Sequence, residues 1–177
     1  MPAATATSAL ALSVSLFRES LAKCAAFQTF VGATGNAAAK EAAALLKIYS
    51  WDDGGVGVRP LAVVSHGDGF TQRRFGYGAH ESSGTILLQL EGAYDATNGI
   101  SDAYMLFLNA LGDICEEVLN ARDANPTAAS VAINGYTLQV APTLLNEKAT
   151  EDDDAITPAN ATKFWLAIAE FTFGLGA

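Results

Sequence analysis

The 177-residue sequence has few charged residues and lacks a long apolar run. Only 16% of its residues are charged, 50% are hydrophobic and the mean hydropathy is +0.22. Arg18, Glu19 and Lys23 interrupt the first apolar segment before it reaches ~18 residues, so no membrane-spanning helix is predicted. The first 20 residues also lack a basic leader, so no signal peptide is predicted.

Positive charge is scarce. The chain has 10 Lys and Arg against 19 Asp and Glu, which gives a net charge of −9 and an isoelectric point near 4.5. Binding to nucleic acid needs Lys and Arg to neutralise phosphates, so specific nucleic-acid binding is not expected. An acidic surface would suit a wall along which DNA slides without sticking, and it equally suits an ordinary acidic protein.

Cysteine is nearly absent. Cys24 and Cys115 each fall within the apolar pattern of a predicted helix, where a free thiol behaves as a small hydrophobe. We therefore expect two buried thiols in a reducing compartment, with a disulfide as the alternative.

Catalytic motifs are also missing: the sequence has no GxGxxG opening a helix, no GxxxxGK[ST] and no GxSxG. His66, Asp68, His80 and Glu81 are the only grouping that could hold a metal or carry out acid–base chemistry, and their spacing does not supply convergent ligands. No catalytic residue, metal ligand or cofactor is predicted. A small metal-dependent hydrolase using these four residues remains the alternative from another class.

The segment from Gly84 to Arg122 organises the chain. Apolar residues alternate from Thr85 to Tyr94, which predicts a strand, and then recur at helical spacing. We expect Ser101 or Asp102 to cap this helix and Arg122 to lie near its C-terminal end.

Two further helices are predicted before it. Residues 1–7 are expected to form a loose arm, and a helix is expected from about Ser8 to Val31, ended by Gly32. Asn36 is placed to cap an alanine-rich helix that continues to Lys47.

The remaining segments favour strands and loops. Strands are predicted at 48–51 and 61–64, and residues 66–84 form a long glycine-punctuated loop or loose hairpin. Asn134-Gly135 predicts a tight turn between strands 131–133 and 136–140. An acidic loop is expected at 146–160.

The last strand is predicted at 163–173. Both of its faces are mostly apolar, so we expect it to lie between two packed layers. Together these elements predict a single α+β domain over residues 1–177. The surplus of small and apolar residues predicts buried contacts between subunits.

One basic and aromatic spot is a candidate subunit interface. It contains Arg73, Arg74, Phe75 and Tyr77, and its arginines could contact phosphate or pair with Asp152, Asp153 and Asp154 of a neighbour, while a solvated loop is the other interpretation. The acidic run lacks the DxDxDG spacing of a calcium loop, so no metal is predicted there.

The order of elements from about Leu10 to Phe173 resembles the tail terminator, or tail completion, proteins of long-tailed bacteriophages. The resemblance implies a mixed, mainly antiparallel sheet packed by two or three helices. It also implies a non-enzymatic ring, commonly of six subunits, that caps the tail tube and joins it to the head.

The expected partners are therefore further copies of the chain, tail tube proteins and head–tail connector proteins. DNA would pass through the channel without specific binding, and no membrane is involved. The chain would be assembled in the host cytoplasm and reside in the tail or neck of the virion. A head–tail connector or a tail tube subunit is the alternative within this class.

Overall fold

The computed structural model describes residues 8–50, 58–75, 79–95, 97, 99–124, 132–148 and 161–176. These residues form four helices and one six-stranded sheet. In chain order the elements are α1 (Ala9–Lys23), α2 (Ala25–Phe30), α3 (Ala37–Leu45), β1 (Ile48–Tyr49), β2 (Leu61–His66), β3 (Thr71–Phe75), β4 (Ala79–Ala93), α4 (Ile100–Ala124), β5 (Ala132–Lys148) and β6 (Ala161–Gly176). None of these helices is long and apolar enough to cross a membrane.

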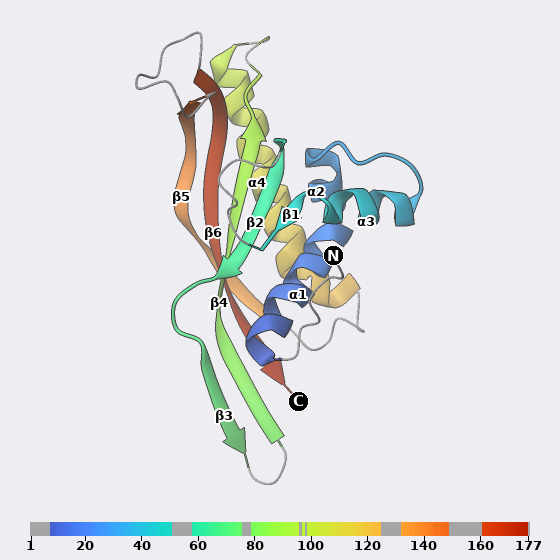
Figure 1. The fold of residues 1–177 in the computed structure, drawn as a ribbon, viewed down its shortest axis with the longest axis vertical. Helices are drawn as coiled ribbons and strands as arrows, with labels where there is room; N and C mark the ends of the chain where they lie inside the picture. Colours follow the sequence, from blue (N-terminus) through green and yellow to red (C-terminus); the bar gives the residue numbers. More distant parts are fainter. Residues whose placement is uncertain are drawn as a thin grey trace.

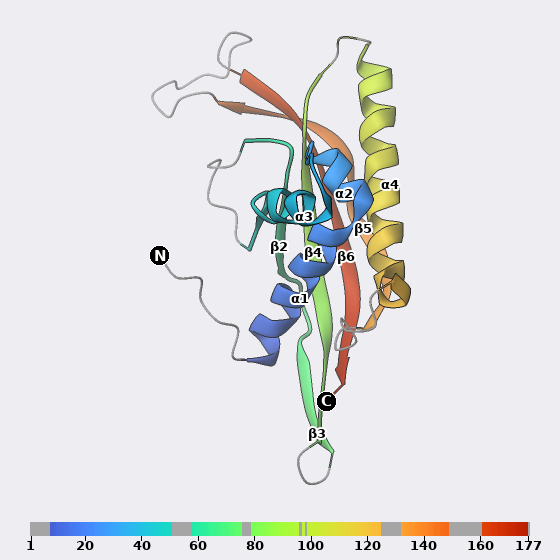
Figure 2. The same cartoon turned by 90° about the vertical axis from the view of Figure 1, so that its right-hand side faces the viewer.

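The predicted fold class is confirmed. The sheet runs β1-β2-β4-β6-β5, with β3 paired to β4. β1 and β2 are parallel and the other pairs are antiparallel, so the sheet is mixed and mainly antiparallel. All four helices lie on one side of it (Figure 1, Figure 2).

The core lies between this sheet and the helices. Alternate residues of the central strands point into it, as the apolar period predicts, and Phe17 of α1 meets Phe171 of β6 edge-on at a centroid distance of 5.2 Å. The fully buried side chains include those of Leu21, Phe27, Ile86, Leu88, Leu90, Ile114, Val118 and Phe173.

The first predicted helix is divided in two, which is why four helices are present rather than two or three. Cys24 takes an extended conformation (φ −64°, ψ 124°) between α1 and α2. The predicted end at Gly32 is confirmed: Gly32 has φ +69°, and the N–H of Ala33 donates to the carbonyl of Gln28 at 2.8 Å. This is the bonding of a Schellman end, which a glycine in the left-handed region permits.

One predicted helix cap is confirmed and the other is wrong. Asn36 caps α3, because its Oδ1 accepts the Ala39 N–H at 3.0 Å. In α4 the Ala103 N–H donates to the Gly99 carbonyl, so the helix begins at Ile100. The predicted caps Ser101 and Asp102 therefore lie in the first turn, where the Asp102 carboxylate still favours the helix dipole.

The described part of residues 66–84 forms a hairpin, the second of the two predicted forms, and not an extended loop. β3 pairs with the first part of β4, from Thr71 opposite Ser83 to Phe75 opposite Ala79. The glycines concealed the alternation here: Gly67 and Gly84 lie where a Cβ would press on Thr85 and on the backbone of Phe70, respectively. These two glycines therefore allow the close approach of neighbouring segments.

The predicted Asn134-Gly135 turn is wrong. Ile133 pairs with Phe173 and Gly135 pairs with Thr172, so both sides of the dipeptide run along the same partner strand. Asn134 is the extra residue of a bulge, and two more register shifts follow it in β5. Gly135 does not have the positive φ that a tight Asn-Gly turn requires, so the dipeptide does not form that turn.

The last strand is confirmed as β6, but not its predicted position between two packed layers. Trp165, Ala167, Ala169, Phe171 and Phe173 are buried against the helices. On the opposite face, Leu166 and Ile168 are half-buried, because no described helix covers that side of the sheet.

Candidate functional site

The β3–β4 hairpin carries the predicted basic spot. Arg73 and Arg74 are exposed on β3, opposite Glu81 and His80 in the register. β6 accompanies β4 only as far as Glu81, so the outer part of the hairpin projects beyond the rest of the sheet (Figure 1). The structure thus places both arginines on the projecting arm.

The other predicted interface residues fall outside what the structure describes. Tyr77, Asp152, Asp153 and Asp154 are not among the described residues, and Phe75 is described only as part of β3. The predicted pairing of the arginines with these aspartates stays a prediction.

His66 fastens the start of α1 to the sheet. Its Nε2 lies 2.6 Å from the Leu10 carbonyl oxygen and 3.4 Å from Ser13 Oγ. A carbonyl oxygen can only accept, so Nε2 carries the proton. The ring also packs near Phe70 and Phe173, at centroid distances of 5.9 and 6.3 Å.

The described members of the grouping that the metal-dependent alternative would use are not brought together around His66. Asp68 is exposed beyond the end of β2, and Glu81 is exposed on the projecting hairpin. Across the described residues, no cluster of three or more His, Cys, Asp or Glu side chains is placed to hold a metal ion. The Nε2 of His66, a metal-binding atom in other proteins, is engaged with α1 instead.

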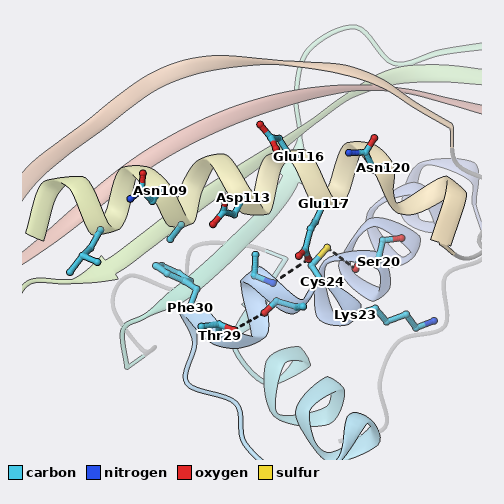
Figure 3. Close-up of a pocket in the computed structure, with 14 residues that line it drawn as sticks. Ser20, Lys23, Cys24, Thr29, Phe30, Asn109, Asp113, Glu116, Glu117 and Asn120 are labelled. Atoms are coloured by element: carbon cyan, nitrogen blue, oxygen red, sulfur yellow. Dashed lines mark hydrogen bonds between the residues drawn. The ribbon is translucent and has the colours of Figure 1, made fainter.

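A groove of about 1060 Å³ lies between α1, α2 and the outer side of α4. Its apolar lining includes Phe30 and Leu106, and the side chain of Leu106 is 68% exposed. Figure 3 shows the polar residues that α4 contributes to the same groove, which are Asn109, Asp113, Glu116, Glu117 and Asn120.

The groove has an acidic wall. Glu117 points from α4 toward α2, where its Oε2 accepts the Ala26 N–H at 3.1 Å (Figure 3). Asp113 and Glu116 are exposed on the same helix. Lys23, the basic residue in the lining, lies 4.0 Å from Glu41 of α3. The lining therefore holds three carboxylates and one ammonium group, which already has an acidic neighbour.

The two thiols are buried and unpaired, as the preferred interpretation of the sequence expects. Cys24 lies at the floor of the groove with an exposed fraction of 5%, and Cys115 lies in the core at 1%. Burial is the main cause that raises the pKa of each thiol to about 12, with Glu117 adding to it at Cys24 and Glu116 at Cys115. Thiolate chemistry in the groove is therefore suppressed.

A buried polar cluster on the uncovered sheet face was not predicted. Arg59 Nε lies 2.7 Å from Glu91 Oε2, with side chains 14% and 9% exposed, and the Gln89 amide donates to Glu91 Oε1 at 2.7 Å. The Arg59 guanidinium also lies 3.7 Å above the Phe164 ring. Glu91 directly after Leu90 in the predicted strand was the available signal, because a buried carboxylate needs a partner.

The groove was also missed, although the sequence contained a sign of it. Asn109, Asp113, Glu116, Glu117 and Asn120 recur at steps of three and four, which places them on one stripe of α4. From the sequence alone this stripe is interpreted as a solvent-exposed helix face, because the positions of α1 and α2 beside it are not known.

No family model matches the chain, and no curated protein matches it.

Proposed function

We propose that the chain is a ring-forming structural subunit of a phage tail or neck, a terminator that caps the tail tube and joins tail to head. The observation that carries this proposal is the one-sided layering of the sheet. Helices cover one face, while the opposite face and the 17-residue strand β5 at the sheet edge have no described element packed or paired beyond them.

The uncovered face is partly apolar. Its half-buried apolar side chains come from three neighbouring strands and comprise Leu87, Val140, Leu145, Leu166 and Ile168. Partly exposed apolar side chains gathered on one sheet face are typical of a surface covered by another molecule. Copies of the same chain would supply such a cover in a ring.

The charge of the chain supports the role proposed for the ring's channel. At −9, the net charge repels a polynucleotide, and the described arginines with exposed side chains, Arg73 and Arg74, are confined to the projecting hairpin. DNA could therefore pass such a ring without being held.

The test is the assembly state. Light scattering after size exclusion should give a mass several times 18.4 kDa, and negative-stain micrographs should show closed rings. A monomer at all concentrations used for assembly would overturn the proposal. Single rings would support a terminator or connector, whereas tubes of indefinite length would favour the tail tube alternative, because a tube subunit stacks without a stop.

Addition of purified rings to tail tubes and to heads, obtained with the products of the neighbouring reading frames, separates the remaining roles. A terminator should bind the ends of tubes and arrest their growth. A connector should bind heads in the absence of tubes.

A further inference from the structure

We infer that the β3–β4 hairpin of one copy docks into the groove between α2 and α4 of the next copy, with the guanidinium group of Arg73 or of Arg74 against the acidic wall. This inference rests on the proposed ring and names the contact that would build it. The occupant of the groove is thus a second copy of this chain.

The groove needs a partner that brings positive charge together with apolar surface. Asp113 and Glu116 are exposed along its α4 side, and Phe30 and Leu106 supply apolar lining beside them. Glu117 accepts the backbone N–H of Ala26, so Asp113 and Glu116 are the carboxylates that can bind a partner.

The hairpin supplies the complementary charge. Arg73 and Arg74 are exposed neighbours on β3, and successive side chains of a strand point to opposite faces. A guanidinium group therefore projects from each face of the arm. Guanidinium groups pair well with carboxylates because their donors match the two carboxylate oxygens.

The geometry favours a contact between copies over a contact within one copy. In both views the hairpin extends from the end of the molecule opposite to α2, so it points away from its own groove (Figure 1, Figure 2). A contact that joins two different surfaces of the same chain is head-to-tail, and such contacts close into rings when the rotation permits.

Pairing of the free β3 edge with the β5 edge of a neighbour is the less favourable arrangement. β5 contains Pro142 and three register shifts, which interrupt the row of backbone groups that an added strand needs. The groove has no such obstacle.

Charge reversal tests the contact. The hairpin variant is Arg73→Glu with Arg74→Glu, and the groove variant is Asp113→Lys with Glu116→Lys; Glu117 is left intact because it caps α2. The control variant, Lys40→Glu with Lys163→Glu, makes the same change in net charge as the hairpin variant on other elements. Thermal melts establish that each variant is folded before its mass is measured.

Each single-surface variant should dissociate, with a dissociation constant raised about 10- to 100-fold, while the control variant forms rings like the wild type. The four-residue variant, which carries both reversals, should regain rings. An equimolar mixture of the hairpin and groove variants should also form rings, and only even-numbered ones, because the two variants must alternate.

The outcomes separate this inference from the proposed function. Rings of normal size in both single-surface variants would overturn the hairpin contact and leave the ring proposal standing; they would point to the β5 edge or the uncovered sheet face. Loss of rings without recovery in the four-residue variant and the mixture would also overturn the contact. A monomeric wild type would overturn both.

Discussion

The carboxylate of Glu117 on α4 accepts the backbone N–H of Ala26 in the first turn of α2, at 3.1 Å. Cys24, the residue that precedes α2, provides no side-chain hydrogen bond to that turn. A side chain 91 residues away in the sequence therefore does the work of a local cap. The same Glu117 carboxylate thus caps the helix that follows the break at Cys24 and forms part of the acidic wall of the groove.

Glu117→Ala should lower the free energy of unfolding by about 0.5–2 kcal/mol, because the Ala26 N–H loses its acceptor. Glu117→Gln retains an acceptor oxygen and should lose less. Urea unfolding followed by circular dichroism measures both. Ser101→Ala, an exposed change on the same helix outside the groove, is the control and should leave the unfolding midpoint nearly unchanged.

Gly92→Ala should destabilise the fold by about 1–3 kcal/mol. A Cβ at Gly92 would lie 2.7 Å from Cδ2 of Phe107, and that ring is held in the core, where it stacks on Trp165. Gly112→Ala is the matched control. A Cβ at Gly112 meets nothing within 4 Å in the middle of α4, so this change should stabilise by about 0.5–1 kcal/mol. Equal melting temperatures for the two variants would contradict the packing described.

Trp165→Ala should cost about 3–5 kcal/mol of the free energy of unfolding. The indole lies among Tyr94, Tyr104 and Phe107, with centroid distances from 5.6 to 6.2 Å, and is 5% exposed. Trp165→Phe should cost much less, since the indole Nε1 has no hydrogen-bond partner among the described residues. A thermal melt unchanged in the Ala variant would show that β6 is peripheral.

Cys24 and Cys115 should resist alkylation in the folded protein at pH 8. Both thiols have a pKa raised to about 12 by burial, so the reactive thiolate is scarce. Both should react fully in 6 M guanidinium. Mass spectrometry after iodoacetamide treatment measures the labels, and rapid labelling of either thiol in the native protein would contradict its burial.

The same two thiols predict a loss of stability in alkali. Above the ordinary thiol pKa of 9.0 the unfolded chain releases protons that the folded chain retains until about pH 12. Stability from these groups is therefore fully present below pH 9 and falls as the pH rises toward 12. Urea midpoints at pH 8 and pH 10 should differ less in a Cys24→Ala variant than in the wild type.

Local patterns predicted the elements whose period runs without interruption. The alternation of Ile86, Leu88 and Leu90 located β4, and the side chain of Asn36 located the start of α3. The α+β class followed from these elements. Patterns of this kind depend on neighbouring residues alone, which is why they could be interpreted without a structure.

Three of the failures have a shared cause, because each involves a distant partner. Asn134-Gly135 has the composition of a turn, but pairing with Phe173 and Thr172 of β6 keeps the strand extended through it. The break at Cys24 depends on Glu117, which lies on another helix. The groove could not be predicted either, since it exists only where α1 and α2 flank α4.

The three register shifts give β5 more chain than the stretch of β6 beside it. Each extra residue adds about 3.3 Å of contour, so the outermost strand is longer than its inner neighbour by roughly 10 Å. An edge strand that is longer than the strand it pairs with has to curve around that strand. The extra residues of β5 therefore cause the curvature of this sheet edge. Deletion of Asn134 should straighten the edge locally without removing a core side chain.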